Sequence, residues 1–165
     1  MQEWRDVPGY EGYYQVSNDG EVRSLTRTLS DGRTWKGRKL KGGYFSNGYK
    51  FIMCRKDGKS FNFSVHRMVA MAFIPNPENY QMVNHKDGNK KNNHVSNLEW
   101  VSGSENQCHS VKTGLRKTKL TKDDVKKIKE LIEQGESQDK MAKMFNVSQL
   151  TISHVLAGKR RYLNE

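Results

Sequence analysis

A histidine stands among amide side chains in the segment from residue 83 to residue 106. His85 follows Asn84 directly, and Asn97 and Asn106 come after it. Hydrolysis of a phosphodiester at neutral pH needs a base that activates water and a cation that stabilises charge on the phosphate and the leaving oxygen. A neutral imidazole can act as the base, and amide oxygens can bind Mg²⁺ or Mn²⁺. These residue types therefore favour phosphodiester hydrolysis.

The elements expected around these residues are a strand, a loop, a strand and a helix. The sequence predicts strands at residues 82–85 and 98–101, separated by a polar loop at residues 86–93. Ser102 followed by Glu105 is a capping-box pattern and predicts a helix over residues 103–111. Because side chains alternate along a strand, the first strand must end or bend at His85 if Asn84 and His85 serve one site.

The first 65 residues predict a small antiparallel β module. Short runs typical of strands occupy residues 13–16, 21–25, 49–55 and 60–65. Asp19-Gly20 and Asp57-Gly58 separate two pairs of them, and such dipeptides favour tight hairpin turns. From Val65 the apolar period changes to that of a helix, which we expect over residues 65–73, before Pro75 and Pro77.

The C-terminal segment predicts three helices behind a basic linker at residues 113–120. An apolar face begins after Thr121, and Gly135 is the expected stop. Ser137 and Ser148 are the expected caps of helices over residues 138–145 and 149–157. Asn146 stands between them, where a tight turn needs a left-handed residue. This layout favours a helix-turn-helix, with a three-helix packing role as the alternative.

The chain is strongly basic, with a formal net charge of +11. Residues 1–60 and residues 113–165 each carry 12 basic and 7 acidic residues, whereas residues 61–112 carry 5 and 4. Two basic segments around a nearly neutral centre favour a nucleic-acid partner, with a solubilising surface as the alternative.

The sequence shows no membrane-spanning, signal-peptide or paired-cysteine pattern. No apolar run is long enough to span a membrane and the N-terminus does not resemble a signal peptide. We therefore expect no membrane partner and an intracellular, cytoplasmic location in a phage-infected or bacterial host cell. Cys54 and Cys108 form no Cys-x-x-Cys pair, so we expect reduced, partly buried thiols.

At the segment around His85 the sequence resembles the HNH endonucleases, and more closely the phage and intron-encoded homing endonucleases. The resemblance rests on His85, Asn97 and Asn106 at family-like spacing, on the Asp87-Gly88-Asn89 loop, and on Asn97-Leu98-x-Trp100-Val101. The N-terminal Glu3-Trp4 to Val22 segment also resembles the NUMOD-type modules attached to such nucleases. With the C-terminal helices, the resemblance covers nearly the whole chain.

The resemblance implies an α+β fold of successive parts. These are an N-terminal antiparallel β module (residues 1–60), a central ββα-metal HNH nuclease unit (61–112), a basic linker (113–120) and a helix-turn-helix bundle (121–165). It also implies His85 as general base, Asn97 as the residue that fixes the catalytic loop, and Asn106 as a metal ligand. The family usually has Asp before the base, as second ligand to Mg²⁺, Mn²⁺ or another divalent cation. Here that residue is Asn84, whose neutral amide should bind the cation more weakly.

Neighbouring residues have competing interpretations. His66 either touches the active site or has a packing role. Asp87 is expected to shape the loop, with a metal role open. Trp100 is expected in the core, and His94 and His109 on the surface.

The expected partner is double-stranded DNA, bound by a monomer that nicks one strand per active site. The residues expected to contact DNA are polar, basic or exposed, and they occupy the two basic segments: Arg23, Arg27, Arg38, Lys39, Gln149, Leu150, Thr151, Ser153, His154, Lys159, Arg160 and Arg161.

Two other functions compete with a DNA endonuclease. One is a DNA-binding regulator whose nuclease core has become inactive; Asn84, where the family usually has Asp, is the residue that would indicate this loss. The other is an RNA-binding protein, which the absence of an evident base-stacking aromatic platform disfavours.

Overall fold

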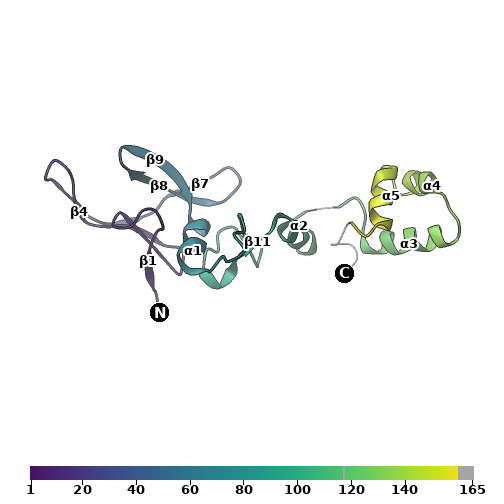
Figure 1. Cartoon of the computed structure of the whole chain (residues 1–165), viewed down its shortest axis with the longest axis horizontal. Helices are drawn as coiled ribbons and strands as arrows, with labels where there is room; N and C mark the ends of the chain where they lie inside the picture. Colours follow the sequence, from purple (N-terminus) through teal and green to yellow (C-terminus); the bar gives the residue numbers. More distant parts are fainter. Residues whose placement is uncertain (117, 160–165) are drawn as a thin grey trace. The chain divides into compact units, whose positions relative to one another are not determined.

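The structure is a computed structural model that describes residues 1–116 and 118–159. It divides into two compact units, Met1–Gly103 and Ser104–Glu165. The first unit contains the antiparallel strands and helix α1, and the second contains the C-terminal helices (Figure 1). The predicted α+β class, with strands first and helices last, is confirmed.

A four-stranded antiparallel sheet begins the first unit. Its strand order is β1-β2-β3-β6. The strands are β1 (Trp4–Asp6), β2 (Tyr14–Ser17), β3 (Val22–Ser24) and β6 (Lys39–Leu40). β2 and β3 correspond to the predicted strands, and Val16 lies opposite Val22 with both side chains buried. No sequence pattern predicts β1 and β6, because two or three residues are too few to show a period.

The remaining hairpins also belong to the first unit. One sheet has the order β7-β8-β9 and a second pairs β4 with β5. The strands are β4 (Arg27–Thr28), β5 (Thr34–Trp35), β7 (Gly43–Tyr44), β8 (Lys50–Lys56) and β9 (Lys59–Ser64). Asp57 and Gly58 join β8 to β9 with φ of 50° and 73°, as a tight hairpin turn requires.

Helix α1 (Val65–Phe73) has the predicted bounds and lies at the centre of the packing. Its buried Val65, Met68 and Val69 join one core with Val16 and Ile52. This core therefore crosses residue 60, which lies inside β9. Cys54 is buried in the same core, and burial raises the pKa of its thiol to about 11.

The predicted order of strand, loop, strand and helix follows α1. β10 (Met82–His85) pairs antiparallel with β11 (Leu98–Val101), and a 3₁₀ turn, η1 (Val95–Asn97), precedes β11. α2 (Gly103–Lys112) comes directly after β11. Trp100 is half-buried against the core and its indole donates to the Ile74 carbonyl at 3.1 Å, in agreement with a packing role.

The second unit has a core of its own. Its helices are α3 (Lys122–Glu133), α4 (Gln138–Met144) and α5 (Gln149–Leu156). Ser137 and Ser148 cap α4 and α5 as predicted, and Asn146 has the expected left-handed conformation, with φ of 49°. The fully buried Leu120, Ile128 and Ile152 hold the helices together.

Candidate active site and DNA interface

His85 is the last residue of β10 and is deeply buried, with 3% of its surface exposed. Its Nε2 lies 3.2 Å from Oδ1 of Asn93, and its ring centroid lies 5.3 Å from that of His66. Burial lowers the pKa of His85, while the Asn93 hydrogen bond and the Asp87 charge oppose that shift. The imidazole is therefore neutral at neutral pH, the form in which it can accept a proton.

Asn97 ties the loop between β10 and β11 together. Its Nδ2 donates to Oδ1 of Asp87 and to the Asn92 carbonyl, both at 2.9 Å, and its Oδ1 accepts from the Asp87 amide at 3.1 Å. Asp87 also accepts from Asn92 Nδ2 at 2.7 Å, and these bonds, first that of Asn92, lower the pKa of the Asp87 carboxyl. Asp87 thus shapes the loop, as its sequence position next to Gly88 suggests.

Asn84 lies on β10 opposite Glu99 of β11. Its Nδ2 donates to Oε1 of Glu99 at 2.9 Å, and 7% of its surface is exposed. The amide nitrogen only donates, so Oδ1 is the Asn84 atom that can accept a hydrogen bond or bind a cation. β10 ends at His85, as a shared site requires, although Asn84 and His85 have different neighbours.

His66 of α1 lies beside the base. Its ring centroid is 4.6 Å from that of Tyr49 and 5.3 Å from that of His85. Burial lowers the pKa of His66 to about 4, so the ring carries no charge that would repel a proton on His85. Within the described chain its buried Nδ1 has no hydrogen-bond partner.

Asn106 lies on α2, in the second unit, and is half-buried. Among the described residues, no group of three or more His, Cys, Asp or Glu side chains is arranged to hold a metal ion. Oxygen ligands are nevertheless available on β10 and β11, where the Asn84 side chain, whose amide also carries an oxygen, donates from Nδ2 to the Glu99 carboxylate. Amide and carboxylate oxygens match the preferences of Mg²⁺ and Mn²⁺.

The basic residues proposed for DNA contact in the first unit differ in how firmly other side chains hold them. Arg23 stacks over Trp4 at 4.2 Å and donates to Gln15, and Lys39 pairs with Glu21 at 2.8 Å. Arg27 stacks over Tyr13 at 4.7 Å, whereas Arg38 is exposed. Arg23 and Arg27 are thus held by aromatic rings.

The residues proposed for DNA contact in the second unit lie on or just after α5. Gln149 and Leu150 are exposed, and Thr151, Ser153 and His154 are half-buried. Leu150 is 63% exposed. Lys159 is exposed, and Arg160 and Arg161 lie outside the described residues.

Three family models match successive parts of the chain. Residues 2–55 match the NUMOD4 motif, residues 63–108 match HNH endonuclease, and residues 116–165 match the CENP-B N-terminal DNA-binding domain. A solved structure of DNA binding and cleavage by the HNH homing endonuclease I-HmuI has a TM-score of 0.58 and 30% sequence identity, covering 94% of this chain and 90% of that one. The chain belongs to the HNH homing endonucleases.

Two phage endonucleases resemble the chain over part of their own length. DNA endonuclease I-HmuI of Bacillus phage SP01 is 46% identical over 100 residues, which cover 61% of this chain and 52% of the relative. H-N-H endonuclease F-TflII of Escherichia phage T5 is 31% identical over 116 residues, covering 68% and 53%. The chain thus spans about half the length of these two relatives.

The sequence patterns of this HNH homing endonuclease do not predict two contacts of the site, those of Asn93 with His85 and of Glu99 with Asn84. Asn93 falls in a polar loop there, and Glu99 is one position of a strand motif. Once the register is known, Glu99 lies directly across from Asn84, and the two side chains share one face of the sheet. No comparable signal marks Asn93, because its contact with His85 depends on how the loop folds back. His94, expected on the surface, is half-buried and caps η1.

Among the described residues, no helix is long and apolar enough to cross a membrane.

Proposed function

We propose that this HNH family member is a metal-dependent DNA endonuclease that hydrolyses phosphodiester bonds. The observation that carries the proposal is His85, buried at the end of β10 beside a loop that Asn97 holds in place. A base must be neutral and fixed before substrate arrives, and burial together with hydrogen bonding meets both needs.

In this proposal His85 takes a proton from the water that attacks the phosphorus. Asn97 positions His85 indirectly, by keeping the turn after β10 closed through Asp87 and Asn92. By the family resemblance, Asn84 and Asn106 are the residues that would hold the divalent cation, and the Glu99 hydrogen bond orients the Asn84 amide. A divalent cation there, Mg²⁺ or Mn²⁺, would supply positive charge to the phosphate and the leaving oxygen.

The proposed substrate is double-stranded DNA, which successive parts of the chain contact. The β module at residues 1–60 and the helices at residues 121–165 bind it, and residues 61–112 cut it, with residues 113–120 as a basic linker. The exposed face of α5 is suited to base contact because Gln149 and Leu150 are followed one turn later by Ser153 and His154. A monomer carries one His85 and therefore nicks one strand.

Supercoiled plasmid gives a direct test. With Mg²⁺ or Mn²⁺ the wild type should convert it to nicked circles before any linear product appears. The variant His85→Ala should lose cleavage by about 100-fold to 10,000-fold, because a general base acts mainly in the transition state. Gel shifts should show DNA affinity within a few-fold of wild type, and a thermal melt controls for folding. Cleavage that survives in His85→Ala would remove this residue from the mechanism.

The same assay separates the second candidate function. A wild-type protein that binds DNA but cuts with neither cation would be a DNA-binding regulator with an inactive core. The neutral Asn84 is the observation that favours this candidate.

A further inference from the structure

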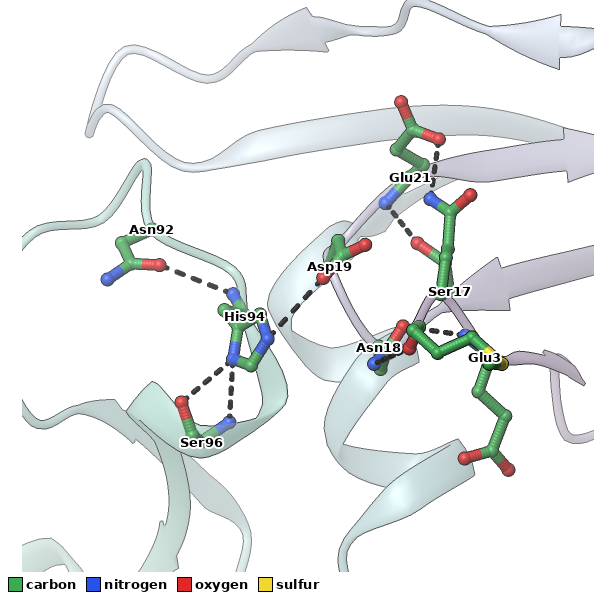
Figure 2. A network of polar contacts seen from close by, with 10 residues as sticks. Glu3, Ser17, Asn18, Asp19, Glu21, Asn92, His94 and Ser96 are labelled. Atoms are coloured by element: carbon green, nitrogen blue, oxygen red, sulfur yellow. Dashed lines mark hydrogen bonds and ion pairs between the residues drawn. The ribbon is translucent and has the colours of Figure 1, made fainter.

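A turn of the N-terminal module lies against the loop that carries the partner of His85. Residues Asn18, Asp19 and Gly20 lie in the connection from β2 to β3, and they contact residues 95, 94 and 93 of the loop in that order. The Asn18 carbonyl accepts from the Val95 amide at 2.8 Å, and Oδ1 of Asp19 lies 3.4 Å from Nε2 of His94. Figure 2 shows Asp19 and His94 pointing toward each other. The third pair is Gly20 and Asn93.

Gly20 fits against Asn93 with no room for a side chain. A Cβ at Gly20 would lie 2.6 Å from Cβ of Asn93 and 3.1 Å from its carbonyl oxygen. Gly20 also has a φ of 79°, which residues with a side chain rarely adopt. The absence of a side chain at residue 20 therefore allows the turn to press directly on the backbone and Cβ of Asn93.

The turn is firmly held on its other side. The Glu3 amide donates to Oδ1 of Asn18 at 2.9 Å, and the Asn18 amide donates to the Glu3 carbonyl at 3.0 Å. Ser17, which is fully buried, accepts from the Glu21 amide through its hydroxyl at 3.0 Å. These contacts are drawn in Figure 2. A turn fixed in this way can limit the movement of the loop that it touches.

Asn93 in turn determines which nitrogen of His85 carries the proton. Its Nδ2 donates to the Lys91 carbonyl at 3.3 Å, so its Oδ1 is the atom that faces Nε2 of His85 at 3.2 Å. An amide oxygen only accepts hydrogen bonds. Neutral His85 must therefore be protonated on Nε2, which leaves the lone pair on Nδ1. Asn93 is 5% exposed, so water cannot easily take over its role.

We propose that the Asn18–Gly20 turn is a positioning element of the active site, which holds Asn93 so that Asn93 keeps His85 in its Nε2–H tautomer. The NUMOD4-like module is then part of the catalytic centre as well as a DNA-binding module. This inference rests on the proposed role of His85 as the base. Asn93 and Gly20 act through His85 and are positioning residues.

Two glycines provide a matched pair of variants. Gly20→Ala adds a Cβ that collides with Asn93, whereas Gly12→Ala adds one at a similar φ of 76° with no atom within 4 Å. Both variants have the same kind of backbone strain, and only the first displaces Asn93. A third variant, Asn93→Leu, keeps the approximate side-chain size and removes the acceptor.

The readout is the ¹⁵N NMR spectrum of the His85 ring in the full-length protein, with single-turnover cleavage measured beside it. Wild type and Gly12→Ala should show the Nε2–H pattern. Gly20→Ala and Asn93→Leu should show a mixture of tautomers and should cleave about 10-fold to 100-fold more slowly, with DNA affinity within a few-fold. Thermal melts confirm that each variant is folded. If Gly20→Ala does not fold, Asn93→Leu still tests the contact between Asn93 and His85.

The inference is overturned if the His85 spectrum of folded Gly20→Ala equals that of Gly12→Ala, or if that of Asn93→Leu equals that of wild type. A failure of the proposed function looks different. In that case the tautomer pattern changes as expected, but His85→Ala cleaves DNA as fast as wild type.

Discussion

The loop around His85 and the helix α5 differ in the burial and hydrogen bonding of their side chains. On the loop and its flanking strands, Asn84, His85, Asn93 and Asn97 are each buried and each is hydrogen-bonded to another residue. On α5, by contrast, Gln149 is exposed, and so is the apolar Leu150.

The contrast follows from what each region is proposed to do. Burying a polar group without a partner costs about 1–3 kcal/mol, so four buried polar side chains persist only where each one is bonded. Such a network fixes rotamers before the substrate arrives, which chemistry requires. Base recognition needs exposed side chains, from which bound water can be displaced by the DNA bases. The first region should therefore tolerate substitution poorly and the second should tolerate it well.

The largest expected effect on stability comes from Asn97→Leu, compared with Gln149→Leu. Loss of the Asn97 amide leaves the Asp87 amide and the Asn92 carbonyl without their partner. We expect unfolding free energy to fall by about 2–4 kcal/mol and cleavage to fall by about 100-fold. Gln149→Leu should change stability by less than about 0.5 kcal/mol. Urea melts and plasmid cleavage measure both, and equal melts would show that the loop network does not hold the fold.

Deletion of residues 120–165 should act on recognition and leave chemistry in place. This removes the whole core of the second unit, starting with the buried Leu120. The remaining chain should still cut, at more sites, and log affinity should depend less steeply on log salt, by roughly one unit per lost phosphate contact.

Cleavage mapping on a randomised target library tests the loss of specificity. The full-length Gln149→Ala and Thr151→Ala variants should relax preference at a few adjacent base pairs, by about 1–3 kcal/mol for each good base contact. If the deletion leaves the site preference and salt slope unchanged, specificity belongs to the basic N-terminal module.

His66 gives a pH-dependent test of the buried region. Its pKa is lowered from 6.5 to about 4 by burial, so between these pH values the unfolded chain binds a proton that the folded chain does not. Stability should therefore fall as pH drops from about 6.5 to about 4, by up to about 3 kcal/mol from this residue. His66→Phe should flatten that part of the profile. Urea melts at several pH values decide it, and parallel profiles would remove His66 as the cause.

The smallest expected effect concerns Asn84 and Glu99. Asn84→Asp should lower the Mn²⁺ concentration needed for half-maximal binding by a few-fold, because a carboxylate adds charge to a hard-ion site. It also places two carboxylates side by side where a 2.9 Å hydrogen bond stood, which should destabilise the metal-free protein.

The double variant Asn84→Asp with Glu99→Gln restores a donor and an acceptor with their positions exchanged, and should regain that stability. Calorimetric titration with Mn²⁺ and thermal melts without metal separate the two effects. A metal requirement that is unchanged in Asn84→Asp would mean that residue 84 does not bind the cation.

The sequence alone predicted the elements that carry the site. The helix over residues 65–73, the strand at residues 82–85 and the capped helices near Ser137 and Ser148 all appear where local patterns place them. These signals succeed because helix period, caps and hairpin turns depend on residues only a few positions apart. The family resemblance is likewise a property of the sequence, since it rests on the spacing of His85, Asn97 and Asn106.

Tertiary structure decided which side chains meet. Glu99 reaches Asn84 through the register of β10 and β11, and Asn93 reaches His85 because the loop folds back. Gly20 meets Asn93 although the two lie far apart in the sequence, since β2, β3 and α1 share one core with β10 and β11. No local pattern encodes such pairs, because they depend on how distant segments pack together and not on the preference of any one of them.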